Sequence, residues 1–265
     1  MTEQNRVALV TGANHGIGAA TAERLAADGI AVVAAFFAID DAEEPERMRR
    51  GHRRDASEVV ERITDAGGRA VSVSADLLDA SVIPGLFDLA EERFGPVDIL
   101  VNNATGSLGD TFAADDTDWM GRPLTRVSAA TFDRQFGVDA RAGALLIAEF
   151  AARIVERGGH GGRIIAMTSG GERGFPQEVS YGAAKAALVN YTFSAGLELS
   201  RYGVTANAVH PPVTDTGWVT DDVREAVERD PAFFSVAEPR EVAEVIAFLV
   251  SDAARRVTGS VIRMG

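Results

Sequence analysis

The sequence predicts an α/β protein with one doubly wound parallel sheet and helices on both of its faces. Short apolar runs alternate along the chain with stretches of helical periodicity. A glycine-rich turn joins the first apolar run to the first helical stretch. No repeat, low-complexity segment or linker interrupts the 265 residues, so we expect a single domain over residues 1–265. In such sheets a ligand binds across the carboxyl ends of the strands.

Each predicted element follows from a local pattern and is bounded by glycine, proline or polar residues. Gly29 ends the first helix, and Gly67 with Gly68 ends the second. The expected strands cover residues 7–10, 31–37, 70–74, 97–101, 164–167, 204–209 and 260–263. The first expected helix follows the glycine-rich turn and ends near residue 27. The other expected helices cover residues 57–66, 81–94, 131–157, 180–202 and 239–250.

Composition narrows the class of function. The net charge of −13 argues against nucleic acid or an anionic membrane as a partner, because both bind basic surfaces. The chain has no cysteine, so it has neither a disulfide framework nor a thiolate metal site, and we expect no metal centre. The first residues enter a strand without the layout of a signal peptide. A cytoplasmic protein that acts on a small molecule is the expectation.

The turn after the first strand has the chemistry of a pyrophosphate site. Its glycines let the backbone approach an anion, and the first amides of the following helix attract it. The spacing is GxxxGxG. The residues of this turn expected to bind a cofactor are Gly12, Asn14, His15, Gly16, Ile17 and Gly18.

The end of the second strand bears on the choice of dinucleotide. An acidic residue there would hold the ribose 2′-hydroxyl of NAD, but Phe36 and Phe37 occupy the place. Asp40 and Asp41 follow and could serve instead. A basic stretch comes next and could meet the 2′-phosphate of NADP, so NADP is favoured over NAD, although a solvated helix face explains the same charges equally well. That stretch contains Arg47, Arg49, Arg50, His52, Arg53 and Arg54.

A tyrosine and a lysine suggest the reaction chemistry. Tyr181 and Lys185 are four residues apart in a predicted helix and therefore share one face. A nearby ammonium favours phenolate and lowers the pKa of a phenol, which makes Tyr181 a candidate proton-transfer group. Ser169 stands at the end of the preceding strand, where its hydroxyl could hold a carbonyl or alcohol oxygen near the phenol. Thr168 is the reserve candidate for that role.

Two segments are expected to border the substrate. Residues 106–128 form a long connection that suggests a functional rim, and residues 212–238 mix aromatic and charged side chains as a lid would. Their apolar side chains could form a pocket wall or could belong to the core. These side chains are Trp119, Met120, Trp218, Phe233 and Phe234.

Taken in order, these residues resemble the short-chain dehydrogenase/reductase family over essentially the whole chain. The pattern consists of T-G-x-x-x-G-I-G at 11–18, Asp76, N-N-A at 102–104, Ser169, Y-x-x-x-K at 181–185, and N-x-V-x-P followed by Thr216. The resemblance implies a Rossmann-type domain that transfers hydride between NAD(P)(H) and a carbonyl or secondary alcohol carbon. The pattern is similar to that of 3-oxoacyl carrier-protein reductases.

The resemblance also implies a role for each matching residue. Tyr181 would transfer the proton, Ser169 would polarise the substrate oxygen, and Lys185 would lower the phenol pKa and bind the ribose. The glycines would face the pyrophosphate, and Asp76 the adenine. Asn102 would lie on the adenosine side, and Thr216 would contact the nicotinamide amide. The remaining expected cofactor contacts are Phe37, Leu77, Asn103, Ala104, Pro211 and Val213.

Three positions depart from the family pattern. Asp139 occupies the place of the usual catalytic asparagine and adds a charge near Lys185, and Thr105 and Pro212 each replace a glycine. These departures keep two alternatives open: a cofactor-binding protein without redox turnover, such as a sensor or assembly subunit, and a lyase or isomerase on the same fold. The resemblance implies a homodimer or homotetramer formed through the helices at 131–157 and 180–202.

Overall fold

We examined a computed structural model, which describes residues 6–39, 50–106, 108–118, 121–170, 174–230 and 234–265. Several residues singled out above lie outside this part of the chain. They are Asp40, Asp41, Arg47, Arg49, Trp119, Met120 and Phe233.

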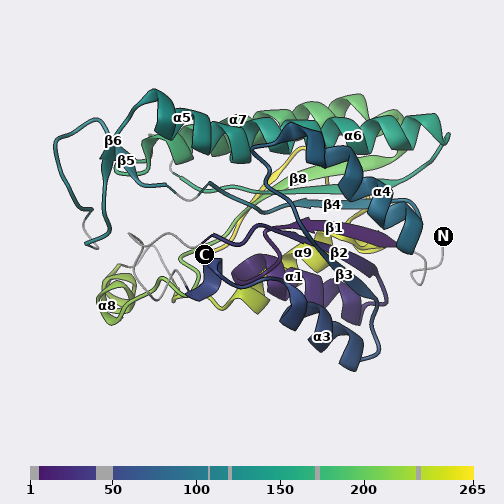
Figure 1. The fold of residues 1–265 in the computed structure, drawn as a ribbon, viewed down its shortest axis with the longest axis horizontal. Helices are drawn as coiled ribbons and strands as arrows, with labels where there is room; N and C mark the ends of the chain where they lie inside the picture. The colour runs from purple at the N-terminus through teal and green to yellow at the C-terminus, as the bar shows by residue number, and fades with distance from the viewer. Residues whose placement is uncertain (1–5, 40–49, 107, 119–120, 171–173, 231–233) are drawn as a thin grey trace.

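A seven-stranded, fully parallel sheet forms the centre of the molecule (Figure 1), and the predicted fold class is confirmed. The strand order is β3-β2-β1-β4-β7-β8-β9. The strands are β1 (Val7–Thr11), β2 (Ala31–Phe36), β3 (Ala70–Ser74), β4 (Ile99–Asn102), β7 (Gly162–Met167), β8 (Val204–His210) and β9 (Val261–Arg263). Most of the central strands are buried throughout, which explains why they are continuous apolar runs in the sequence.

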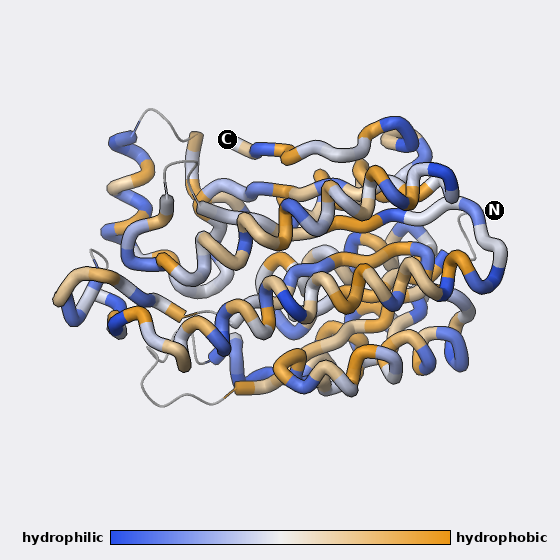
Figure 2. Tube along the Cα trace, turned by 90° about the horizontal axis from the view of Figure 1, so that it is seen from above, coloured by the Kyte–Doolittle hydropathy of each residue, from blue (hydrophilic) through white to orange (hydrophobic). Residues whose placement is uncertain are grey.

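Helices cover both faces of the sheet. One apolar core joins it to α1 (Gly16–Ala27), α3 (Ser57–Asp65) and α9 (Pro239–Val250). A second core joins the other face to α4 (Ile83–Arg93), α6 (Gly143–Glu156) and α7 (Val179–Glu198). Figure 2 shows hydrophobic and hydrophilic stretches alternating along the helices, as helices packed on one side require.

The chain reverses direction across the sheet between β1 and β4. From β1 it proceeds outward through β2 and β3, and it then returns to continue through β4, β7 and β8 on the other side. A crevice opens at the carboxyl ends of the strands at such a switch point. The loops after β1, β4, β7 and β8 all meet there.

The structure corrects the helix predicted over residues 131–157. It consists of α5 (Ala129–Phe136), a π-helical segment η3 (Gly137–Ala142) and α6. The wider turn accommodates an extra residue and places Asp139 in the interior, where it is 1% exposed. Hydrophobic periodicity did not mark this insertion.

The two segments expected at the substrate side carry structure of their own. The connection at 106–128 contains the short parallel pair β5 (Asp110–Thr111) and β6 (Thr125–Arg126). The lid contains α8 (Asp221–Arg229), which packs through Val223 and Val227 in a small apolar cluster next to Trp218. In Figure 1 both segments lie at the same end of the molecule, beyond the carboxyl ends of the strands.

Membrane-spanning helices and metal-binding clusters are both absent from the described residues. None of the helices there combines the length and hydropathy needed to cross a bilayer. That part of the chain also contains no group of three or more His, Asp or Glu side chains placed to hold a metal ion.

Candidate active site

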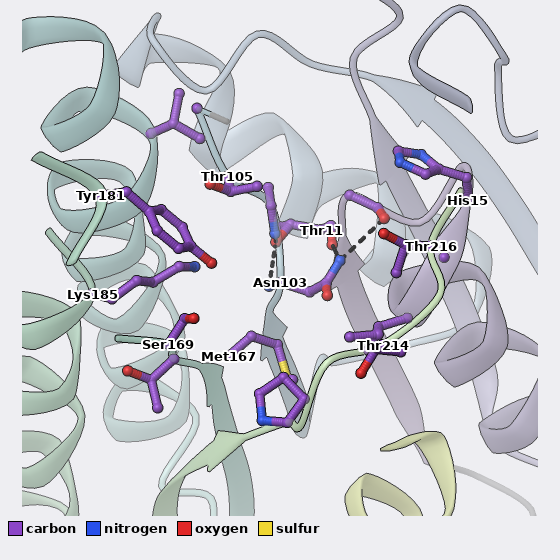
Figure 3. A pocket seen from close by; sticks show the side chains of 18 of the residues that line it. Thr11, His15, Asn103, Thr105, Met167, Ser169, Tyr181, Lys185, Thr214 and Thr216 are labelled. Atoms are coloured by element: carbon purple, nitrogen blue, oxygen red, sulfur yellow. Dashed lines mark hydrogen bonds between the residues drawn. The ribbon is translucent and has the colours of Figure 1, made fainter. Parts of the chain in front are cut away.

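A cavity of about 840 Å³ opens at the carboxyl ends of the strands, within the usual size range of small-molecule sites. Residues from the glycine turn, the ends of β2, β4, β7 and β8, and the start of α7 line it. Figure 3 shows Tyr181, Lys185 and Ser169 on one side of it and His15 and Thr216 on the other. The cavity therefore places the predicted reaction chemistry at one end and the predicted phosphate turn at the other.

Hydrogen bonds from β4 brace the glycine turn. The Asn103 side-chain amide donates to the carbonyl oxygens of Thr11 at 2.9 Å and Gly12 at 3.1 Å. The Thr11 hydroxyl accepts from the backbone N–H groups of Asn103 at 3.0 Å and Ala104 at 3.1 Å. These bonds fix the turn before any ligand arrives, so the Asn103 side chain acts first as a brace.

Close approaches explain the glycines of this turn. A Cβ at Gly16, where φ is +55°, would lie 2.9 Å from Thr216. A Cβ at Gly18 would lie 2.1 Å from the Gly12 carbonyl oxygen. Gly18 does not line the cavity. It lets the first turn of α1 pack against the loop, and its expected contact with pyrophosphate stays a prediction. Thr216 lies beside the phosphate turn, and this arrangement gives no support to its expected contact with the nicotinamide amide.

Tyr181, Lys185 and Ser169 converge at the other end of the cavity. The Lys185 Nζ lies 5.6 Å from the centre of the Tyr181 ring, and the Ser169 hydroxyl is close enough to the phenol to lower its pKa. Thr168 also lines the cavity, but its backbone N–H donates to the Val209 carbonyl oxygen and so extends the pairing of β7 with β8. The contact with the phenol favours Ser169 over Thr168 as the polarising hydroxyl.

Burial decides the protonation of these groups. Burial raises the pKa of Tyr181 above its ordinary value of 10.0, and the opposing effect of the Lys185 ammonium is the smaller one. Burial by itself would lower the pKa of Lys185, but attraction to Asp139 outweighs it and the net pKa is raised. The expected lowering effect of Lys185 on the phenol pKa is thus present, but burial outweighs it. Without a bound ligand, the site holds a phenol and an ammonium.

Asp139 lies beneath the cavity and does not line it. Its Oδ1 atom is 2.8 Å from Lys185 Nζ. The expected charge near Lys185 is therefore present as a direct ion pair. Asp139 reaches the reacting groups only through Lys185.

A carboxylate distant in sequence caps the helix that carries Tyr181 and Lys185. Asp110 of β5 accepts from the backbone N–H of Ser180 at 2.8 Å and from its hydroxyl at 2.5 Å. Asp110 and Ser180 are both buried. A negative charge at a helix N-terminus is stabilised by the helix dipole, so this pair fixes the start of α7. Asp110 was not a candidate residue, because its partner is 70 positions away.

A charged group borders the expected substrate end. Arg122 forms ion pairs with Asp118 at 2.5 Å and Glu178 at 3.3 Å, and its guanidinium lies 5.8 Å from the Trp218 ring centre. Arg122, Glu178 and Trp218 line the cavity together with the apolar Leu108. Of the five predicted wall residues, Trp218 therefore borders the cavity, and Phe234 is 89% exposed and does not.

The adenosine end combines aromatic, acidic and histidine side chains. Phe37, Asp76, Leu77 and His52 line it. The His15 and His52 rings meet edge to face at 5.1 Å between their centres. Asn102 was expected on this side, but it does not line the cavity, and its amide donates to the Gly143 carbonyl oxygen at 3.3 Å.

Most of the predicted site residues thus surround one cavity. Gly18, Asn102 and Asp139 are predicted site residues in the described part of the chain that lie outside its lining. The predicted residues that line it are Gly12, Asn14, His15, Gly16, Ile17, Phe37, Asp76, Leu77, Asn103, Ala104, Ser169, Tyr181, Lys185, Pro211, Val213 and Thr216.

Comparisons with known proteins agree with this arrangement. A family model described as Enoyl-(Acyl carrier protein) reductase matches residues 12–264. Cis-4-hydroxycyclohexanecarboxylate dehydrogenase from Sinomonas cyclohexanicum is 36% identical over 260 residues, which cover 97% of this chain and 94% of that protein. A blue fluorescent protein from a metagenomic library, solved in complex with NADPH, is similar with a TM-score of 0.81 and 29% identity, covering 100% of this chain and 98% of that one. The angucycline C-6 ketoreductase LanV with bound NADP has a TM-score of 0.78 and 34% identity over 98% of this chain and 94% of its own.

Proposed function

The chain belongs to the short-chain dehydrogenase/reductase family, and from this premise we propose the role of each side chain in the cavity. Proteins of this family are NAD(P)-dependent oxidoreductases, and this chain is one of them. The observation that carries the proposal is that Ser169, Tyr181 and Lys185 meet in the same cavity as the braced glycine turn. The assignment of individual residues rests on this geometry.

The cavity fits a dinucleotide. Gly12 and Gly16 leave space that a Cβ would fill, and the N-terminus of α1 points amide hydrogens at that place. When bound, the nicotinamide supplies or accepts the hydride. We propose that the glycine turn holds the pyrophosphate and that Asp76 and Leu77 border the adenine.

The protein's own groups handle the proton. In the direction of carbonyl reduction, the Ser169 hydroxyl donates a hydrogen bond to the substrate oxygen and polarises it. The Tyr181 O–H bond breaks, its proton moves to the substrate oxygen, and its electron pair stays on the phenolate. The Lys185 ammonium stabilises that phenolate. General acid catalysis of this kind contributes about 10²- to 10⁴-fold to the rate.

NADP(H) is the proposed cofactor. The second strand ends in Phe36 and Phe37 rather than in an acidic residue, and two similar structures contain NADPH or NADP. His15 and His52 line the adenosine end, where a 2′-phosphate would need donors. Nicotinamide fluorescence measured during separate titrations with NADPH and NADH tests this choice, and tighter binding of NADH would reverse it.

We propose a homodimer or homotetramer as the assembly. The outer faces of α5, α6 and α7 expose Phe132, Leu145, Tyr191 and Leu197, and exposed apolar side chains gathered on neighbouring helices are typical of subunit contacts. Light scattering over a range of concentrations tests this, and a monomer mass throughout would contradict it. The absence of cysteine keeps the cytoplasm as the proposed location.

The decisive experiment replaces the phenol. Tyr181→Phe removes one oxygen from a half-buried ring that lines the cavity and leaves the glycine turn untouched. We expect reduction of a panel of ketones by NADPH to fall at least about 100-fold, while NADPH affinity stays within about threefold of the unmodified protein. Tyr191→Phe is the matched control, because Tyr191 is half-exposed on the outer face of α7 and lies outside the cavity. Unchanged turnover in Tyr181→Phe would refute the assignment.

A second candidate function keeps the fold and the cofactor without redox turnover. The observation that favours it is the departure of Asp139 and Pro212 from the family pattern. Tight NADPH binding without oxidation by any ketone would support this sensor or lyase alternative.

A further inference from the structure

Asp139 and Lys185 form an ion pair that is shut off from solvent. The Asp139 side chain is 0% exposed and the Lys185 side chain 2%. Their atoms Oδ1 and Nζ are 2.8 Å apart. A buried ion pair persists only where its remaining hydrogen-bonding capacity is satisfied, so the surroundings of the other carboxylate oxygen matter.

Three donors converge on the Asp139 Oδ2 atom. The Gln135 side-chain amide donates at 2.6 Å, the backbone N–H of Gly106 at 2.8 Å and the Thr105 hydroxyl at 3.2 Å. The same Gln135 amide also donates to the Thr105 hydroxyl at 3.3 Å. Hydrogen bonds to a carboxylate favour its charged form. Thr105 and Asp139, two departures from the family pattern, are therefore in direct contact.

The orientation of Gln135 is fixed from its other side. Its Oε1 atom accepts from the backbone N–H of Leu108 at 3.1 Å, which leaves only the NH₂ group to face Asp139. Gln135 is fully buried. A glutamine held in this way can donate to Asp139 but cannot accept from it.

Both oxygen positions of Asp139 thus face donors only. Oδ1 meets an ammonium, and Oδ2 meets two N–H groups and a hydroxyl that is itself held by Gln135. A carboxylate offers acceptors at both positions, whereas an amide offers one acceptor and one NH₂ donor. An asparagine here would direct its NH₂ either at the ammonium or at the three donors. The pocket around residue 139 is built for a carboxylate.

We propose that Asp139, held as a carboxylate by Gln135, Thr105 and Gly106, is a positioning residue that fixes and neutralises the Lys185 ammonium, so that Tyr181 works as a proton donor to a carbonyl. The kinetic part of this inference rests on the proposed function. Gln135 and Thr105 become supporting residues, of which the sequence analysis singled out Thr105 alone. The consequence is that Tyr181 is held at neutral pH as the neutral phenol, the form that donates a proton to a carbonyl oxygen.

The charged groups around the phenol agree with this proposal. Burial raises the pKa of Tyr181, Lys185 opposes the rise, and Asp139 and Glu178 add to it. Glu178 is itself paired with Arg122 at 3.3 Å. The negative charge that Asp139 sets against Lys185 therefore keeps the phenol protonated to higher pH than the ammonium alone would.

The first test does not need a substrate. The chain has three tyrosines, so Tyr191→Phe and Tyr202→Phe leave Tyr181 as the single phenol whose ionisation changes the ultraviolet absorbance. In this background we expect Asp139→Asn to lower the ionisation midpoint of Tyr181 by about 1 pH unit or more, because an opposing charge is removed from its ammonium neighbour. Asp133→Asn, an exposed position on α5, is the matched control and should leave the midpoint in place. A midpoint that stays or rises in Asp139→Asn overturns the proposal, whether or not the protein reduces ketones.

The second test uses Thr105 and remains available if Asp139→Asn does not fold. Thr105→Val removes the hydroxyl at nearly constant volume, and Thr105→Ser restores it. We expect kcat for ketone reduction to fall between about twofold and tenfold in Thr105→Val, with KM for NADPH unchanged and activity recovered in Thr105→Ser. In the Asp139→Asn background, Thr105→Val should lower kcat only slightly further. Equal kcat in Thr105→Val and the unmodified protein, or loss that serine does not rescue, overturns the role of Thr105.

Discussion

The packing at Gly18 predicts that replacing glycine by alanine destabilises the protein at this position, whereas the same replacement at Gly85 stabilises it. In Gly18→Ala the new Cβ would lie 2.1 Å from the Gly12 carbonyl oxygen and 2.6 Å from the Asn103 amide nitrogen. The nearer contact involves backbone, which a rotamer change cannot relieve. To reach a tolerable separation of 3.0 Å, the turn and the start of α1 must part by about 0.9 Å.

The cost follows from this displacement. Overpacking of a well-packed site typically costs about 1–3 kcal/mol, and alanine regains up to about 1 kcal/mol through helix propensity. We expect the free energy of unfolding to fall by about 0–3 kcal/mol, which corresponds to at most roughly 12 °C in melting temperature for a chain of this size. The Gly12 oxygen moves with the pyrophosphate turn, so affinity for NADPH should fall at least about tenfold.

Gly85→Ala is the matched control. Gly85 lies in α4, is exposed, and a Cβ there would meet nothing within 4 Å. Removing a helical glycine should stabilise the protein by about 0.5–1 kcal/mol. Thermal melting with and without NADPH compares the two variants. If Gly18→Ala melts as high as Gly85→Ala and binds NADPH as tightly as the unmodified protein, the packing argument is wrong.

Three further changes test other parts of the site. Thr11→Val leaves the backbone N–H groups of Asn103 and Ala104 without their acceptor, and calorimetry should show a loss of about 2–6 kcal/mol, at about 1–3 kcal/mol for each unpaired donor. Lys185→Met leaves the Asp139 charge buried and uncompensated, so urea unfolding should show a loss of about 3–5 kcal/mol, much of which Lys185→Met with Asp139→Leu should recover. Because the folded-state pKa values of Tyr181 and Lys185 are both raised above 10.0 and 10.5, their contribution to stability is complete below about pH 10 and is lost as pH rises through the folded values. Tyr181→Phe should flatten the alkaline fall in unfolding free energy, and an unchanged slope would contradict this sign.

Local patterns were sufficient to predict the sheet and the two ends of the cavity. The apolar runs, the glycine turn, and Tyr181 with Lys185 four residues later each depend on a few neighbouring residues. The strand ends then bring these features together, because parallel strands share one carboxyl edge. This is why most predicted site residues surround a single cavity.

Other features depend on tertiary contacts that no local pattern records. Asp110 caps α7 from 70 residues away, and nothing in its own surroundings in the sequence marks it. The net pKa of Tyr181 depends on burial, which outweighs the neighbouring ammonium. The partners of Asp139 come from one loop and two helices, so their convergence could be seen only in the folded chain.

The π-helical segment has a consequence for changes in chain length. An α-helix turns by about 100° per residue. One additional residue therefore rotates the side chains that precede it about the helix axis relative to those that follow it. Because η3 absorbs that residue, α6 keeps Leu146, Phe150 and Ile154 in the core while α5 presents Gln135 to Asp139. Loss of a single residue between 137 and 142 would straighten the helix and turn these two surfaces out of phase. Either the core or the site would then be lost, although every side chain on both surfaces was retained.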